Sequence, residues 1–187
     1  MNYFKILIGL IGFSILPAAQ AGVTTWYAGV GLGYATANIS TSDYQVPVAD
    51  VNSHGLGSKI NLGYRFHQNW AIEADYIYFG KTKSSQGDFS TRAATLSLIG
   101  IVPLNEQVAV NGKAGFYRSF VSVDDGLFPN SKKPENVTGF SYGARIKYKL
   151  SEAVDASLDW DQIISRKDTT LQTNNRLASV NITYNFI

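Results

Sequence analysis

The chain has 187 residues, a formal net charge of +2, 13% aromatic residues and only 16% charged residues. The low charged fraction argues against a disordered tail, and the near-neutral balance argues against a nucleic-acid-binding protein. The absence of cysteine excludes disulfides, thiolate metal sites and a lipoprotein anchor. The chain has two histidines, His54 and His67, and so few histidines argue against zinc binding and histidine-dependent catalysis. We expect no cofactor and no metal.

The first 21 residues have the features of a secretory signal peptide. Lys5 precedes an apolar stretch at 6–16, which is too short for a membrane-spanning helix. The sequence Ala-Gln-Ala at 19–21 is a typical small-x-small cleavage site. We therefore expect residues 1–21 to be removed and residues 22–187 to form one domain, with a retained N-terminal anchor as the alternative.

Eight later stretches alternate between apolar and polar residues, which predicts half-apolar β-strands of about the nine to eleven residues that a tilted membrane strand needs. In chain order the stretches are 26–35, 56–66, 70–78, 94–98, 108–116, 140–148, 155–161 and 178–186. The connections after the odd-numbered stretches are long, and the others are tight. The long connections are 36–55, 80–91, 121–137 and 163–175, and the tight ones are 67–69, 103–106 and 151–153. This pattern predicts an all-β fold, an eight-stranded antiparallel up-and-down transmembrane β-barrel.

The position of the charges indicates which face of these strands meets lipid. No Asp, Glu, Lys or Arg lies on the apolar faces, whereas the opposite faces carry five cations and five acids. The apolar faces hold too many large side chains to fit inside eight strands, so we expect them to point outward. Aromatic residues gather near the strand ends, as interface girdles do. A soluble barrel with the apolar face inward is the alternative.

We expect the inward charges to form a salt-bridged plug, with a conduction path as the alternative. The order of the strands suggests two clusters in the lumen. The first is Lys59, Arg65, Glu73 and Asp75, and the second is Lys113, Arg145, Lys147, Asp155 and Asp159. Asp161 is the tenth inward charge.

Several short motifs, taken together, resemble the family of eight-stranded outer-membrane barrels of Gram-negative bacteria, in particular the N-terminal transmembrane domain of outer membrane protein A. The motifs are Trp26-Tyr27-Ala28-Gly29, Leu32-Gly33-Tyr34, Gly63-Tyr64, Glu73 with Tyr76 and Gly80, Pro103, Lys113-Ala114-Gly115 and Tyr184-Asn185-Phe186. The resemblance covers the whole of residues 22–187 and implies a location in the outer membrane.

The resemblance also implies roles for single residues. Tyr184 and Phe186 match the closing aromatic signal that the barrel-assembly machinery reads, although here Ile187 follows the final aromatic residue. Glu73 matches the interior acid to which the family's small conductance is attributed. By the same alignment, the usual basic partners of that acid fall on Ile99 and Ser157, and an expected acid falls on Lys147.

An even number of strands places both termini on one side of the membrane, which we expect to be the periplasm. The expected function is structural and surface-interacting. The expected partners are outer-membrane lipids and lipopolysaccharide, the barrel-assembly machinery and, through the long loops, a host-cell or phage ligand, but not nucleic acid. A narrow porin-like channel is one alternative, and a lipid-modifying enzyme is another. No catalytic residue is assigned, because His54 and His67 fall at opposite ends of the predicted barrel.

Overall fold

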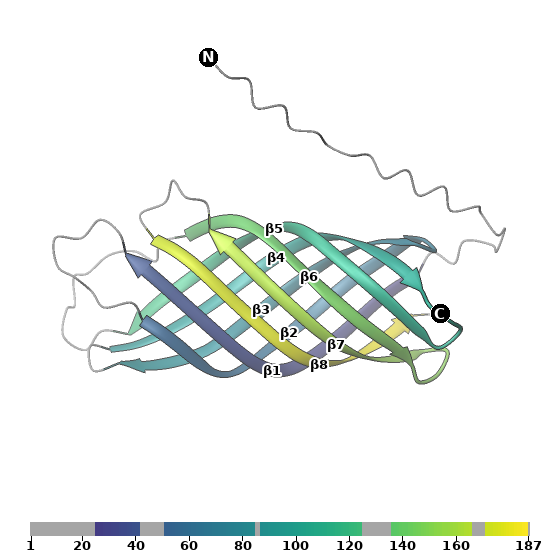
Figure 1. The fold of residues 1–187 in the computed structure, drawn as a ribbon, viewed down its shortest axis with the longest axis horizontal. Coiled ribbons are helices and arrows are strands. Elements are labelled where there is room, and N and C mark those ends of the chain that lie inside the picture. The colour runs from purple at the N-terminus through teal and green to yellow at the C-terminus, as the bar shows by residue number, and fades with distance from the viewer. Residues whose placement is uncertain (1–24, 42–50, 85–86, 125–135, 166–170, 187) are drawn as a thin grey trace, which may run out of the picture.

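The computed structural model describes residues 25–41, 51–84, 87–124, 136–165 and 171–186 (Figure 1). These residues form eight strands: β1 Thr25–Thr41, β2 Val51–His67, β3 Trp70–Ser84, β4 Gly87–Pro103, β5 Val108–Asp124, β6 Asn136–Lys149, β7 Val154–Ser165 and β8 Leu171–Phe186. The part of the chain described here contains no helix long and apolar enough to cross a membrane. The expected signal peptide at 1–21 lies outside the described residues.

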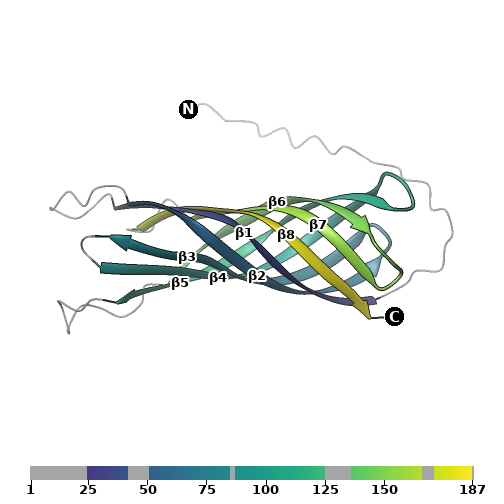
Figure 2. The same cartoon turned by 90° about the horizontal axis from the view of Figure 1, so that it is seen from below.

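The eight strands form a closed barrel in which each strand is antiparallel to both neighbours. β1 pairs with β2 on one side and with β8 on the other, and the pair Trp26 and Phe186 lies where the sheet closes. Figures 1 and 2 show the strands inclined to the barrel axis, with the C-terminus beside the tight turns. We call this the short-turn end, and we call the end where β1, β3, β5 and β7 finish the long-connection end. The predicted all-β up-and-down barrel is confirmed.

The strands are longer than the sequence pattern predicted. They contain 12 to 17 residues and continue into the stretches expected to be connections at 36–55, 80–91, 121–137 and 163–175. Ser84 of β3, for example, still pairs with Gly87 of β4. The reason is that ladder hydrogen bonds need only backbone groups, whereas the apolar alternation marks only the part of each strand that carries the apolar band.

An irregularity in β3 begins just after Tyr78. The register with β4 shifts between Tyr78 and Lys81, and Gly80 has a φ of 89°. Residues with a side chain rarely adopt this backbone conformation, so glycine suits the bulge. Ile77, just before the bulge, and Phe79, within it, are both buried.

The outer wall is apolar and the lumen holds the charges, as predicted. The side chains of Leu32 and Val180 are 63% and 59% exposed on the outside, whereas Asp159 is 5% exposed. Ile60 and Ile72 are likewise exposed on the wall. The soluble alternative, with these side chains in the interior, is therefore wrong.

The lumen also contains two apolar clusters that the sequence analysis did not predict. They lie on the two sides of the charged residues, one towards each end of the barrel. The cluster towards the long-connection end is Ala35, Ile77, Phe79, Ala93, Tyr117, Ile163 and Leu177, and the one towards the short-turn end is Tyr27, Ala71, Ile99 and Ile101, with Ala109 packed against it. Part of the interior is thus closed by packing as well as by charge.

Candidate functional site: a charged ring in the lumen

Arg145 on β6 is the centre of the charged layer in the lumen. Its Nη1 and Nη2 donate to the two carboxylate oxygens of Glu73 on β3, each at 2.8 Å. Its Nε donates to Asp159 Oδ2 on β7, also at 2.8 Å. This two-pronged contact with Glu73 is the geometry in which a guanidinium holds a carboxylate most firmly. All three side chains are almost completely buried.

Lys59 and Lys113 complete the layer. Lys59 Nζ lies 2.5 Å from Asp159 Oδ2 and 2.8 Å from Asp161 Oδ2. Lys113 Nζ lies 2.5 Å from Asp161 Oδ1 and 3.6 Å from Glu73 Oε1. The contacts therefore form a closed circuit in which cations and acids alternate. We call it the charged ring, and its members are Lys59, Asp159, Arg145, Glu73, Lys113 and Asp161.

Asp75 is attached to the charged ring without being part of the circuit. Its Oδ2 lies 3.0 Å from Lys113 Nζ and accepts a hydrogen bond of 2.7 Å from Thr95. Ser157 similarly donates to Asp159 Oδ1 at 2.7 Å. Ser157 thus occupies the oxygen of Asp159 that the ion pairs leave open, and Thr95 adds a second donor to Asp75 Oδ2. Both hydrogen bonds lower the cost of burying the charges.

The ion pairs do not follow the two clusters expected from strand order. No ion pair joins Lys59 or Arg65 to Glu73 or Asp75 within the described residues. Glu73 instead reaches Arg145, and Lys59 reaches β7. The grouping was wrong because the lumen of eight strands is narrow, so long side chains reach across it to strands that are not neighbours.

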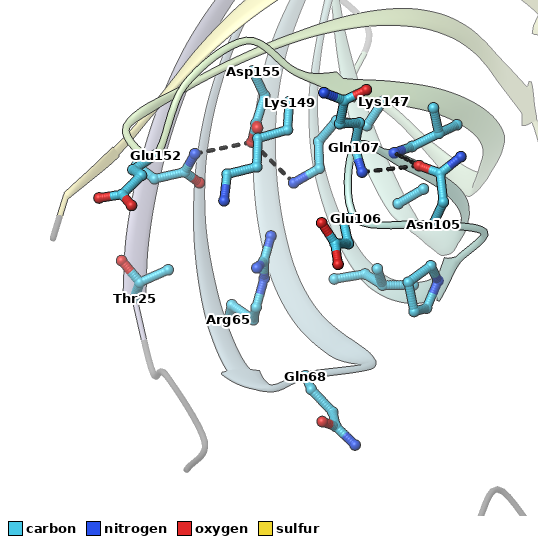
Figure 3. A pocket seen from close by; sticks show the side chains of 15 residues that line it. Thr25, Arg65, Gln68, Asn105, Glu106, Gln107, Lys147, Lys149, Glu152 and Asp155 are labelled. Atoms are coloured by element: carbon cyan, nitrogen blue, oxygen red, sulfur yellow. Dashed lines mark hydrogen bonds and ion pairs between the residues drawn. The ribbon is translucent and has the colours of Figure 1, made fainter. Parts of the chain in front are cut away.

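Two pairs expected in the second cluster do form. Arg145 contacts Asp159, and Lys147 Nζ lies 2.9 Å from Asp155 Oδ2 nearer the short-turn end (Figure 3). Asn185 also donates to this oxygen at 2.9 Å. The pair of Lys147 and Asp155 shares no contact with the charged ring in the described part of the chain, and it forms a separate site.

The alignment with the resembled family did not find the partners of Glu73. Ile99 lies in an apolar cluster, and Ser157 is a hydrogen-bond donor to Asp159. Lys113 and Arg145 supply the basic groups instead. Their inward position could be read from the sequence, but the contact with Glu73 could not, because it joins residues 40 and 72 positions away in the chain.

The two histidines do not form a site. His54 lies near the start of β2 and His67 is its last residue, so the strand separates them by about 43 Å at a rise of about 3.3 Å per residue. Within the described ranges, no three His, Cys, Asp or Glu side chains are arranged to hold a metal ion.

Aromatic pairs lie on the outer wall, one near the short-turn end and one near the middle of β6 and β7. Trp26 and Tyr64, near the short-turn end, have ring centroids 4.9 Å apart. Tyr142 and Trp160 lie further along the wall, with centroids 5.7 Å apart. Such pairs are typical of the girdles that anchor a barrel at the two membrane surfaces.

Comparison with known proteins agrees with this architecture. The chain is 25% identical over 197 residues to outer membrane protein A of Yersinia pseudotuberculosis, covering 97% of this chain and 54% of that protein. It thus spans about half the length of that relative. It is 24% identical over 180 residues to an uncharacterized Haemophilus influenzae protein, covering 86% of this chain and 90% of the other.

Solved structures share the fold at low sequence identity. Neisserial surface protein A superposes with a TM-score of 0.65 at 19% identity, covering 86% of this chain and 97% of that one. The Yersinia pestis attachment invasion locus protein Ail, solved with the heparin analogue sucrose octasulfate, gives 0.55 at 15% identity, covering 86% and 99%. Residues 6–186 match the family described as outer membrane protein beta-barrel domain, so this chain belongs to that family and is a barrel of the Gram-negative outer membrane.

Proposed function

We propose that the protein is a structural barrel of the outer membrane that is closed to solutes and interacts with partners at its long-connection end. The charged ring is the observation that carries the first part. It joins β2, β3, β5, β6 and β7 across the lumen, and an apolar cluster lies towards each end of it. A solute would have to break several buried ion pairs to pass, and breaking even one is costly.

Planar-bilayer recording tests whether the lumen is closed. We expect the wild-type protein to give no stable single-channel currents, and Glu73→Ala to raise the leak because it leaves Arg145 without its two-pronged partner. Arg92→Gln, which changes a charge on the outer wall, is the control and should stay closed. Large, stable wild-type currents would contradict the proposal.

A narrow channel is the second candidate function, and one distance favours it. The contact between Lys113 and Glu73 is 3.6 Å, the longest in the charged ring. A ring opens most easily at its weakest contact, so a rare conducting state would begin there. Brief currents that Lys113→Gln makes more frequent would support this candidate over permanent closure.

The partners at the membrane surface include lipopolysaccharide in this proposal. Arg92 on β4 and Arg118 on β5 project from the outer wall towards the long-connection end. Their guanidinium carbons lie 5.9 Å from the ring of Tyr78 and 5.8 Å from that of Phe120. Arginine held against an aromatic ring at the edge of the apolar band is well suited to bind lipid phosphate groups.

Lipopolysaccharide binding by the refolded barrel tests this partner. The double variant Arg92→Gln, Arg118→Gln should bind roughly 30-fold more weakly, since each basic residue near an anionic surface contributes about 1 kcal/mol. Glu152→Gln, at the short-turn end, is the control. Equal binding by all three proteins would contradict the contact. Any host-cell or phage ligand would bind the same end of the barrel. Ail, which shares the fold, was crystallised in complex with the heparin analogue sucrose octasulfate.

The orientation proposed for the barrel places both termini in the periplasm. The chain has no cysteine, so single cysteines can be introduced without background labelling. On intact cells, an impermeant thiol reagent should label Ser84→Cys at the end of β3 and leave Glu152→Cys in a tight turn unlabelled. The opposite result would reverse the orientation.

Mass measurement of the mature protein should also show Gly22 as its first residue.

Assembly through the closing strand is the last part of the proposal. Tyr184 and Phe186 both point outward on β8, with ring centroids 5.3 Å apart, where the assembly machinery can reach them. Phe186→Ala should lower the amount inserted in cells while leaving refolding in detergent unchanged. An equal loss in both settings would assign the residue to stability alone. Ile187 lies outside the described residues.

A further inference from the structure

The mouth of the barrel at the short-turn end is hollow. A cavity of about 280 Å³ opens there, enclosed by strand ends and by the tight turns (Figure 3). Three cationic side chains line it: Arg65 from β2 and Lys147 and Lys149 from β6. Figure 3 shows the ends of these three side chains converging on the same space from two sides of the mouth.

The cations in this mouth are only partly neutralised. Lys147 is paired with Asp155, whose Oδ2 also accepts from Asn185. Among the described residues, neither Arg65 nor Lys149 forms an ion pair. The Nε of Arg65 is buried and has no hydrogen-bond partner, although a buried donor of this kind normally has one. The mouth thus contains a buried donor that nothing in the described part of the protein satisfies.

Two of the three acids that line the cavity occupy its rim, and the third, Asp155, is buried and paired with Lys147. Glu106 and Glu152 both line it, both are exposed, and both belong to the tight turns. Deeper in the lumen, a small recess is lined by Arg65, Lys147 and Arg145 together with neutral side chains, and by no carboxylate. The positive charge of the mouth therefore increases inward, away from the two glutamates.

We propose that this mouth binds a small soluble anion with phosphate or carboxylate oxygens, held by Arg65, Lys147 and Lys149. The planar guanidinium of Arg65 would take two oxygens of the anion, and the lysines would act as point donors. Because all three side chains point into the barrel and not towards lipid, a soluble anion fits the site better than a lipid headgroup. The inference is independent of the proposed surface role.

Titration of the refolded full-length chain in an uncharged detergent tests the site. Inorganic phosphate and acetate are the two probes, and the ¹⁵N resonance of Arg65 Nε and calorimetry are the two readouts. We expect saturable binding of at least one probe, weakened by added NaCl, with a shift of the Nε resonance. Arg65→Gln should lower the affinity about tenfold, as expected when one charge-assisted partner is lost.

Two further variants separate a site from general charge attraction. Lys149→Gln should weaken binding several-fold, whereas Glu106→Gln, its control on the same rim, should leave binding unchanged or make it tighter. Heat-dependent gel mobility reports whether each variant is folded, and if Arg65→Gln fails to fold, Lys149→Gln decides the question.

Three results would overturn the inference. They are the absence of saturable binding of either probe, equal weakening by Lys149→Gln and Glu106→Gln, and a shift of the Arg65 resonance that occurs only in nanodiscs containing phosphatidylglycerol. The last result would assign the contact to a lipid headgroup.

Discussion

The charged ring and the short-turn mouth each hold three cations inside the same barrel, but the surroundings of these cations differ. In the ring, every cation touches at least two carboxylates. In the mouth, one lysine has a single acidic partner, and the other two cations have none among the described residues. The middle of the lumen is therefore arranged to stay closed, while the mouth has unused hydrogen-bonding capacity and space.

The difference between the two regions also follows their distance from water. Lys59 and Glu73 are almost completely buried, so their charges must be paired within the protein. The side chain of Lys147 is 16% exposed, and Lys149 is exposed, so water can complete their hydrogen bonds. A free cation is thus tolerated in the mouth and not in the ring.

The largest expected effect comes from breaking the ring at its centre. Arg145→Ala leaves Glu73 and Asp159 without their shared partner and should lower the free energy of unfolding by about 3–5 kcal/mol. Lys149→Ala, in the mouth, should change it by less than about 1 kcal/mol. Urea unfolding in lipid vesicles, followed by tryptophan fluorescence, measures both. Similar values for the two variants would remove the distinction between the regions.

A smaller effect is expected on the outer wall, where the middle and the end of the barrel also differ. Ile146→Arg and Leu98→Arg place a charge in the apolar band and should destabilise by about 2–4 kcal/mol, with reduced membrane insertion. Leu150→Arg, in a tight turn, should cost about 0–1 kcal/mol. Leu150 is exposed like Ile146, so the pair isolates depth in the membrane. Equal losses of stability at the two positions would mean that the apolar band does not lie at the depth in the bilayer that we assign to it.

The smallest effect is expected from the pair of Lys147 and Asp155. A double-mutant cycle with Lys147→Gln and Asp155→Asn should give a coupling energy of about 1 kcal/mol, because water reaches the pair. The same kind of cycle with Arg145→Gln and Glu73→Gln should give a clearly larger coupling. A coupling at Lys147 as large as that at Arg145 would show that the mouth is as tightly held as the ring.

The apolar clusters in the lumen show what sequence alternation alone missed. Ile77, Ile99 and Leu177 occupy positions on the polar faces of their strands, so their inward direction could have been read from the period of two. The charged residues dominate the inward faces in the sequence, and the apolar residues between them were not predicted to pack together. What no pattern could show is that residues from six strands, far apart in the chain, meet in one cluster.

The sequence by itself determined the number of strands, their order, the direction in which each side chain points and the membrane-facing wall. These features depend on the alternation of side chains within a single strand and on the length of the connections, which are local properties. Only the closed barrel decided that Glu73 meets Arg145 and that Lys59 meets Asp159. Such contacts depend on the width and stagger of the barrel, which are set by all eight strands together.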